Sequence, residues 1–569
     1  MAVARHLIAA APASEPCIDL RAHRVVIPSH YAARLVHEQL ALQAPAGVLP
    51  PQFQTPNDFL NLGYTANQVA APTDELMAWI EVLLGTERTT LTALLPHAST
   101  GCFELTEARH LAQVFTALRE ELGMSEWGRD FAAVAHLPGN PEPARWEDLA
   151  RLEASYRQVL RERGYEDRND ARVAAAAGTH IPNEFSQLWL AGLTEPQPLF
   201  LKAVARMEAI IPIHVVVGAP EEETGFDPWG RPDPLAWRER RTPWETFNQG
   251  VHVVRDPDEA LSLLRTLVGG VGPAGGLHAV CACDREVEAP RIGAVIRALG
   301  GEALDTLGVP HGSHFLHHGL KVWARLIGSS SPDLALMREA MHLPALAAAV
   351  ATHAKVAGGV DYAFQQVNTC LDAVDRAFFR GSLDQTISQL EALAADEGTD
   401  PSPTRERQQI EDARRVLLAI RAFIAPLRGL ASLCTSLWRN RVSAALISVT
   451  LITAAEKRFR QSDVDNAVNL PGWLEAPWDP APHLIIHGLN DHLLPRADHA
   501  HPFLPGQLRA LVGLPSNEQT FAAAAFALEQ IRRRRETNGW VDVIVPQTAT
   551  RSGLRGCFSS PPTRSCRRE

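Results

Sequence analysis

Short apolar runs bounded by Pro, Gly or polar residues recur along this chain and alternate with segments whose apolar residues follow helical spacing. The runs at 24–28, 187–190 and 211–217 predict buried strands, because each is short and rich in Val, Ile or Leu. Residues 31–42 predict the helix that follows the first of these strands. This alternation is typical of a parallel sheet joined by crossover helices.

The region between the first two runs has a helical pattern. In one segment, five large side chains share one face at helical spacing: Trp146, Leu149, Leu152, Tyr156 and Leu160. We interpret residues 65–177 as a helical insertion into a first parallel-sheet domain, which is made of residues 1–64 and 178–225.

The second half of the chain repeats this plan after a break. Residues 226–250 include a stretch rich in Pro and Trp without periodicity, which predicts a linker. Residues 251–254 and 278–283 predict strands, and a helix is expected from Asp258 between them. A mostly helical pattern follows, before another apolar run at His483–His487. These segments predict a second parallel-sheet domain at 251–301 and 461–547, with a helical insertion at 302–460.

The run at His483–His487 leads into the most informative loop of the chain. Gly488 indicates a tight turn, and a helix is expected to begin at about Gly506. Ligands of parallel sheets lie at the carboxyl ends of the strands. We therefore expect the functional site at residues 488–495, with Asn490 held there by the turn.

Three stretches around this loop carry a recognisable pattern: GWLEAPWDPAP, HLIIHGLNDHLLP and PFLPGQLRALVGLPSN. They resemble the second motor domain of AddB-type proteins, which are helicase-like nuclease subunits of double-strand-break repair complexes and relatives of RecC and superfamily 1 helicases. Weaker similarity extends over most of the chain. The pattern is kept at Gly488, Asn490, Pro495, Phe503, Leu504, Pro505 and Arg509. His492 and Gly506 depart from it, where Gly and Asp are usual. The resemblance implies two RecA-like domains, each with a large helical insertion. The PD-(D/E)xK nuclease domain of the family would follow the point where this chain ends, so we expect a chain truncated before that domain.

The motifs of an ATP-hydrolysing motor are missing from the sequence. A phosphate-binding loop needs Lys after Gly and before Ser or Thr. None of the four lysines has this context: Lys202, Lys321, Lys355 and Lys457. A strand that holds magnesium would end in acidic residues, but the run LWL ends in Ala191-Gly192. We therefore expect no ATP hydrolysis and no cofactor.

The nuclease motif of the implied family is also missing. It needs an acidic residue two positions before a lysine to hold a divalent metal, and Phe200, Gly319, His353 and Ala455 stand there instead. The family resemblance thus indicates an enzyme subunit, whereas the missing motifs argue against catalysis. The sequence leaves open whether the chain is an enzyme. Composition changes abruptly after Gln547, so we interpret residues 548–569 as a frameshifted or truncated end, with a native basic tail as the alternative.

Composition narrows the class of protein. A net charge of −11 gives no general attraction for nucleic acid, although it is compatible with a local basic channel. Eight scattered Cys are typical of a reduced, cytoplasmic protein rather than a disulfide framework. No run reaches the roughly 20 apolar residues of a membrane span.

Two kinds of ligand contact are available near the loop. His and Asp side chains gather there and could hold a divalent metal, although polar loop and packing roles are favoured: His483, His487, Asp491, His492, Asp498, His499 and His501. Arg496, Arg509 and Arg532 could contact phosphate. Arg532 begins a four-Arg run. The end of a helix, where the helix dipole favours cations, would also explain this run. Trp473 and Trp478 are expected in the core.

We predict a catalytically silent, helicase-like scaffold that holds a DNA end or single strand beside an active helicase–nuclease subunit of the AddA type. Its expected DNA contacts are Asn490, Arg496, Arg509 and Arg532. One alternative is a metal-dependent hydrolase that uses the His/Asp loop at 487–501, which elemental analysis would detect. The other is a protein-binding scaffold without DNA contact, which an assay of single-strand binding would separate.

Overall fold

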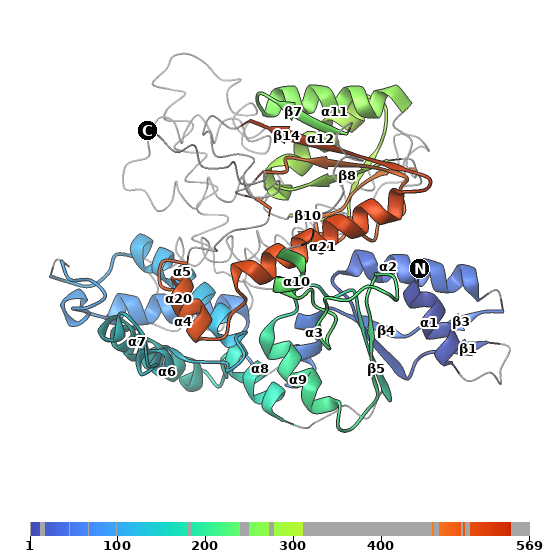
Figure 1. Cartoon of the computed structure of the whole chain (residues 1–569). Helices are drawn as coiled ribbons and strands as arrows, with labels where there is room; N and C mark the ends of the chain where they lie inside the picture. Colours follow the sequence, from blue (N-terminus) through green and yellow to red (C-terminus); the bar gives the residue numbers. More distant parts are fainter. Residues whose placement is uncertain are drawn as a thin grey trace, which may run out of the picture.

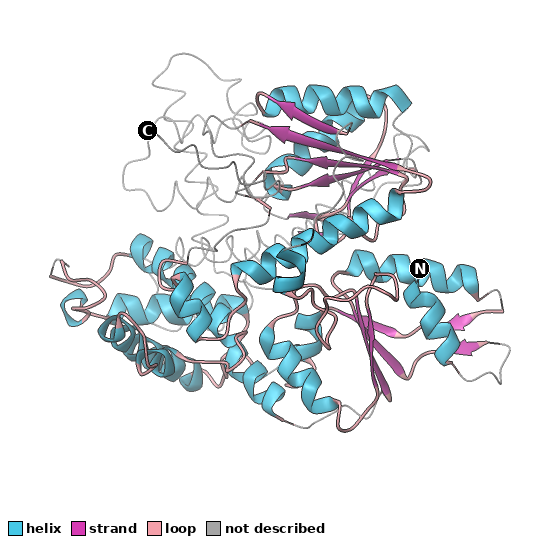
Figure 2. Cartoon of the chain, viewed as in Figure 1, coloured by secondary structure: helices cyan, strands magenta, loops and turns pink. Residues whose placement is uncertain are grey.

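Two parallel sheets organise the chain (Figures 1 and 2). The computed structural model describes residues 2–11, 17–44, 46–65, 68–97, 100–178, 185–238, 240, 250–271, 278–310, 458–459, 466–490, 493–494 and 501–547. Within these ranges, one sheet has four strands in the order β4-β2-β5-β6, and the other has six in the order β7-β14-β13-β8-β12-β9. All neighbouring strands in both sheets are parallel. The predicted α/β class with two parallel sheets is therefore confirmed.

The first sheet is built from both ends of the first half of the chain. Its strands are β2 (His23–Val26), β4 (Gln52–Gln54), β5 (Gln187–Ala191) and β6 (Ile213–Val216). One face packs against α1 (Ala2–Ala10) and α2 (His30–Gln43), and the other against α3 (Pro56–Asn61) and α9 (Pro198–Met207). A short parallel pair lies beside it, β1 (Ile18–Asp19) with β3 (Val48–Leu49). The three predicted strands and the predicted first helix are all present, whereas β4 was not predicted.

Local sequence explains where the helices of this sheet begin. The Ser29 side chain accepts a hydrogen bond from the Ala32 amide at 3.2 Å and caps α2. Thr55 and Asp58 form a reciprocal capping box at the start of α3, in the sequence TPND. Pro198 occupies the first turn of α9, where its missing N–H leaves no helical bond unmade.

A helical region lies between β4 and β5 in the sequence. It contains α4 (Pro72–Gly85), the 3-10 turn η2 (Arg88–Thr90), α5 (Leu105–Gly123), α6 (Phe131–Ala135), α7 (Pro143–Glu162) and α8 (Arg168–Ala177). The five α7 residues predicted to share one face are all buried. Trp79 of α4 stacks on Tyr156 of α7 with ring centroids 4.3 Å apart and planes 8° apart. Aromatic packing of this kind stabilises the core beyond the area it buries.

The core of this helical region is completed by residues from far along the chain. Phe503 and Leu504, together with Leu508 of α20 (Gly506–Leu511), join the apolar cluster formed by α4, α5, α6 and α7. Figure 1 shows α20, drawn in red, among the blue helices α4 and α5. The helix predicted to begin at Gly506 is thus present, and it packs on the first half of the chain.

The segment predicted as a linker begins with ordered structure. Trp237 of α10 (Pro234–Arg238) lies with its ring centroid 5.1 Å from that of Phe526 in α21 (Asn517–Arg535). Phe226 packs on the same ring at 4.9 Å. Figure 1 shows α21 running between the two sheets. Residues 226–238 therefore help to join the two halves of the chain, and residues 241–249 lie outside the described ranges.

The second sheet repeats the layered plan of the first. Its strands are β7 (Val251–Val254), β8 (His278–Ala282), β9 (Ala303–Asp305), β12 (Val468–Leu470), β13 (His483–His487) and β14 (Trp540–Pro546). One face packs against α11 (Pro257–Val271) and α12 (Arg285–Ala298), and the other against α21. A short antiparallel pair joins β10 (Val309–Pro310) to β11 (Arg458–Phe459).

Several predictions concern residues without a description in this structure. Most of the predicted insertion at 302–460 and the whole tail at 548–569 lie outside the described ranges. No helix within those ranges is long and apolar enough to cross a bilayer.

Strand β13 lies inside the second sheet. It pairs with β8 on one side and β14 on the other, and all five of its residues are buried. Burial on both faces is what a central strand of a parallel sheet requires, and it explains the continuous apolar run LII. The loop after His487 therefore leaves from the middle of the sheet.

Candidate functional site at the carboxyl edges of the two sheets

The second sheet has a topological switch point between β8 and β13. The chain leaves β8 for α12 on one face, whereas it leaves β13 toward α21 on the other. A crevice forms where the connections that follow two neighbouring strands leave on opposite faces of the sheet. Ligands of open α/β sheets bind in such crevices. Gly488 follows β13 with φ of 79°, and its amide donates to the Ile544 carbonyl at 3.0 Å. A positive φ of this size is the left-handed conformation that favours glycine.

Buried polar atoms without partners gather near the end of β13. Among the described residues, neither ring nitrogen of His487 nor Oδ1 of Asn490 makes a hydrogen bond, although both side chains are buried. Nδ1 of His487 lies 3.4 Å from Oε2 of Glu288 in α12. Burial lowers the pKa of His487 to about 4, so its imidazole is neutral at physiological pH. Unsatisfied buried polar groups are rare in native proteins and call for an explanation such as a ligand.

The predicted DNA-contacting arginines are differently placed. Arg496 lies outside the described residues. Arg509 of α20 pairs with Glu121 of α5, which is the carboxylate partner that a purely structural role would need. Arg532 of α21 pairs with Glu529 of the same helix at 2.9 Å and with Glu536, directly after the helix, at 3.1 Å. These ion pairs explain both arginines structurally and leave their contact with DNA a prediction.

The rest of the four-Arg run holds α21 to its surroundings. Arg533 pairs with Glu223 of the first half of the chain at 3.0 Å. Nε of Arg535 donates to the Ala481 carbonyl and its Nη2 to the Asp479 carbonyl, each at 3.1 Å. Arg535 is only 3% exposed, and this burial lowers its pKa to about 10.

The first sheet has its own switch point, between β2 and β5. The chain leaves β2 for α2 and leaves β5 for α9, on opposite faces. Residues 471–482, which we call the bridging segment, connect β12 to β13 and cover this place. Trp478 of the bridging segment packs with the apolar cluster of β2, β5 and α2, as expected of a core residue.

Gly192, directly after β5, provides room for that indole. A Cβ at this position would lie 2.6 Å from Cζ2 of Trp478. Gly192 also has φ of +60°, which favours glycine. The Ala191-Gly192 pair at the end of LWL is thus explained by close approach of a tryptophan.

A buried polar contact lies beside the indole. The hydroxyl of Tyr31, in the first turn of α2, donates to Asp479 of the bridging segment. Nδ2 of Asn469 in β12 donates to the Tyr31 oxygen at 3.0 Å and to the Asp479 carboxylate at 3.2 Å. Burial, with the nearby charge of Asp479, raises the pKa of Tyr31 far above its ordinary value, so the phenol stays protonated.

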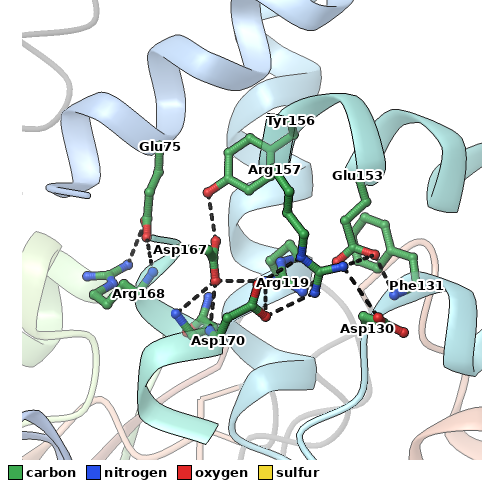
Figure 3. Close-up of polar contacts among 11 residues, drawn as sticks. Glu75, Arg119, Asp130, Phe131, Glu153, Tyr156, Arg157, Asp167, Arg168 and Asp170 are labelled. Atoms are coloured by element: carbon green, nitrogen blue, oxygen red, sulfur yellow. Dashed lines mark hydrogen bonds and ion pairs between the residues drawn. The ribbon is translucent and has the colours of Figure 1, made fainter. Parts of the chain in front are cut away.

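The helical region contains a dense group of ionisable side chains (Figure 3). Arg119 of α5 pairs with Glu153, with Asp167 at 2.7 Å and with Asp170 at 2.9 Å. The Tyr156 hydroxyl donates to the other oxygen of Asp167 at 2.7 Å. Three helices and the cap of α8 are thereby joined around one guanidinium.

Two further arginines extend this network. Arg157 binds both oxygens of Asp170, at 2.7 and 2.9 Å, and also approaches Asp130. Arg168 binds both oxygens of Glu75, through its amide at 3.1 Å and its guanidinium at 3.2 Å. The residues of Figure 3 thus bring five carboxyl groups to three guanidinium groups.

Two buried carboxyl groups of this network have raised pKa values. Burial is the main cause that raises the pKa of Glu75 and of Glu153, in each case to about 7. Strongly shifted groups often mark catalytic sites, but structural networks produce them too. Here Arg119 and Glu153 are 3% and 1% exposed and are bonded to each other, so we assign the network a structural role.

The amino-terminal edge of the second sheet carries a chain of histidines. Nδ1 of His278 lies 2.8 Å from Nδ1 of His483, and Nε2 of His483 lies 2.8 Å from Asp542. Nε2 of His252 reaches the other oxygen of Asp542 at 2.7 Å. His483 thus belongs to this edge and is separated from His487 by the length of β13. In the described part of the chain, no group of three or more His, Cys, Asp and Glu residues is arranged to hold a metal ion.

No protein-family model and no curated protein matches this chain.

Proposed function

We propose that this chain is a catalytically silent, helicase-like scaffold of a DNA double-strand-break repair complex, which binds a DNA end or single strand beside an active helicase–nuclease partner. The observation that carries the silent part is the occupied crevice of the first sheet. Trp478 and Asp479 lie at the carboxyl ends of β5 and β2, where a nucleotide would otherwise bind. The absence of a Gly-Lys-Ser/Thr motif supports the same proposal.

The crevice of the second sheet supports the binding part of the proposal. The buried Oδ1 of Asn490 and the neutral His487 offer hydrogen-bonding groups at the end of a central strand. Asn490, Arg496, Arg509 and Arg532 are the residues we propose to contact DNA. The guanidinium groups of Arg509 and Arg532 would then be shared between phosphate and the carboxylates that already bind them, Glu121 and Glu529.

Single-strand binding tests this proposal directly. The dissociation constant of a fluorescent oligonucleotide would be measured by anisotropy over a series of salt concentrations. We expect binding that weakens as salt rises, and a salt slope that falls by about one unit in Arg496→Ala. Asn490→Ala should weaken binding with little change in slope, because its amide carries no charge. Arg21→Ala, which alters an exposed arginine between β1 and β2, is the control.

Absence of binding at low salt would overturn the DNA function and favour a protein-binding scaffold. Equal loss of affinity in Arg21→Ala and Arg496→Ala would show that the attraction is unspecific and would overturn the assignment of the loop.

A metal-dependent hydrolase is the second candidate, because His487 and Glu288 bring an imidazole nitrogen and a carboxylate oxygen within 3.4 Å. Neutral imidazole and carboxylate are common ligands of divalent transition metals. This function would also use side chains of the loop at 491–500, most of which lies outside the described residues. Elemental analysis of the purified protein tests it: stoichiometric metal that is lost in His487→Ala would favour the hydrolase over the silent scaffold.

A further inference from the structure

The bridging segment is anchored to the second half of the chain by contacts that do not involve the first sheet. Oε2 of Glu475 accepts hydrogen bonds from the Gly472 amide at 2.9 Å and from the Thr306 hydroxyl at 2.5 Å, and it pairs with Arg285. At its other end, Arg535 binds two of its carbonyl groups. The segment therefore has a defined shape that does not depend on the first sheet.

This preformed segment presents two adjacent side chains to the first sheet. The Trp478 indole fits against Gly192, and the Asp479 carboxylate receives the Tyr31 hydroxyl. Asp479 is 0% exposed and Tyr31 is 2% exposed, so their contact is buried from bulk solvent. The segment thus places an aromatic ring next to an anion, at the end of β5 and the first turn of α2. A ligand of such a crevice would combine the same two kinds of group.

We propose that the bridging segment is a built-in occupant of the first sheet's crevice, which excludes external ligands and locks the two sheets together. This inference does not rest on DNA binding. Opening the crevice would expose the indole and leave the Asp479 carboxylate without the Tyr31 hydroxyl, and a buried group that loses its partner is destabilised. Contacts of α21 with Gly218 and Glu223, and of α20 with α5, hold the same two halves of the chain at other points.

Hydrogen exchange of the full chain, followed by mass spectrometry, tests the proposal. In the parent protein the Ala32 and Ala33 amides, which donate to Ser29, and the amides of residues 188–192 should exchange slowly. Trp478→Ala should accelerate them by about tenfold or more, because it opens the crevice locally. Leu474→Ala is the matched control, since Leu474 belongs to the same segment and is 43% exposed. Equal exchange in Trp478→Ala and Leu474→Ala would overturn the proposal.

Two milder variants keep the test decisive if Trp478→Ala does not fold. Trp478→Phe retains an aromatic ring and should give intermediate exchange. Tyr31→Phe removes one oxygen atom and should accelerate exchange at Ala32 and Ala33. Combining it with Asp479→Asn should produce a smaller shift in melting temperature than the sum of the two single shifts. Additive shifts, or unchanged exchange in Tyr31→Phe, would show that the contact does not hold the crevice closed.

Discussion

The Asp542 carboxylate joins His483 and His252, with one oxygen 2.8 Å from the ring of the first and the other 2.7 Å from the ring of the second. Burial by itself would raise the pKa of Asp542, but the hydrogen bonds from His483 and His252 outweigh it and lower the pKa. A carboxyl group whose pKa is lower in the folded protein stabilises the fold above its unfolded pKa. This stabilisation is lost as the pH falls through the folded value.

Asp542→Asn should therefore lower the free energy of unfolding at pH 7 by about 1–3 kcal/mol, because an amide can accept from one histidine but turns its NH₂ toward the other. Urea unfolding at pH 7 and below pH 3.8 would measure the loss, which should shrink at the lower pH. Asp258→Asn, which changes a carboxylate that is 88% exposed on α11, is the control. Equal effects of the two substitutions would contradict the role of the histidine chain.

Glu75 and Glu153 should make the helical region less stable as the pH rises. Both have pKa values raised to about 7, so between their unfolded values near 4.5 and about pH 7 the folded protein binds more protons than the unfolded chain. Their contribution to stability is then fully present below pH 4.5 and is lost through about pH 7, at up to about 1.4 kcal/mol per pH unit for each group.

Glu153→Gln isolates one of these groups. Urea unfolding between pH 5.5 and pH 8 should show a shallower pH dependence in this variant than in the parent protein. Glu162→Gln, at the exposed end of α7, should leave the slope unchanged. Parallel curves for the parent and Glu153→Gln would show that Glu153 does not titrate in this range.

Arg509 and Glu121 allow the DNA role of α20 to be separated from its structural role. If Arg509 contacts phosphate, Arg509→Ala should weaken single-strand binding and lower the salt slope by about one unit. Glu121→Gln should strengthen binding, because it releases the guanidinium and removes a nearby negative charge. If the ion pair only holds α20 to α5, both variants should lower the melting temperature and leave affinity unchanged.

ATP should be neither bound nor hydrolysed by this chain. We expect no DNA-stimulated ATPase above a mock purification, and no increase in melting temperature with magnesium and ATP, since a ligand of the folded state would raise it. Hydrolysis that co-purifies with the chain and is removed by Gly192→Ala would contradict the prediction. That substitution places a Cβ 2.6 Å from Trp478, at the position where an active motor would hold magnesium.

The sequence pattern predicted those elements whose position depends on the spacing of nearby apolar residues. The apolar runs at β7 and β13 were predicted with their observed boundaries. Strand β13 is buried on both faces, which leaves a continuous apolar signal, whereas β7 is a partly exposed edge strand whose three valines favour strand structure. The shared face of α7 was also confirmed, because its five large side chains repeat at helical spacing. Strand β4 was missed because Gln52–Gln54 has only one apolar residue. Its strand conformation is stabilised by pairing with β2.

The contacts that define the candidate site could not be predicted in this way. Tyr31 and Asp479 are 448 residues apart, and Arg509 and Glu121 are 388 residues apart. Periodicity reports which face of an element is buried and carries no information on which distant segment covers it. Asp167 gave a usable signal as the cap of α8, but its bond to Arg119 depends on how α5 packs.

The apolar cluster of the helical region is completed by Phe503, Leu504 and Leu508, although its own helices end with α7. During translation, residues 72–162 leave the ribosome on the order of tens of seconds before residue 508 is made, at about 5–20 residues per second. Throughout that interval Phe115, which lies 6.0 Å from Phe503 between ring centroids, lacks its final cover. A growing chain in this condition presents apolar surface to chaperones, so the yield of folded protein in a cell should depend on how long synthesis takes to reach α20.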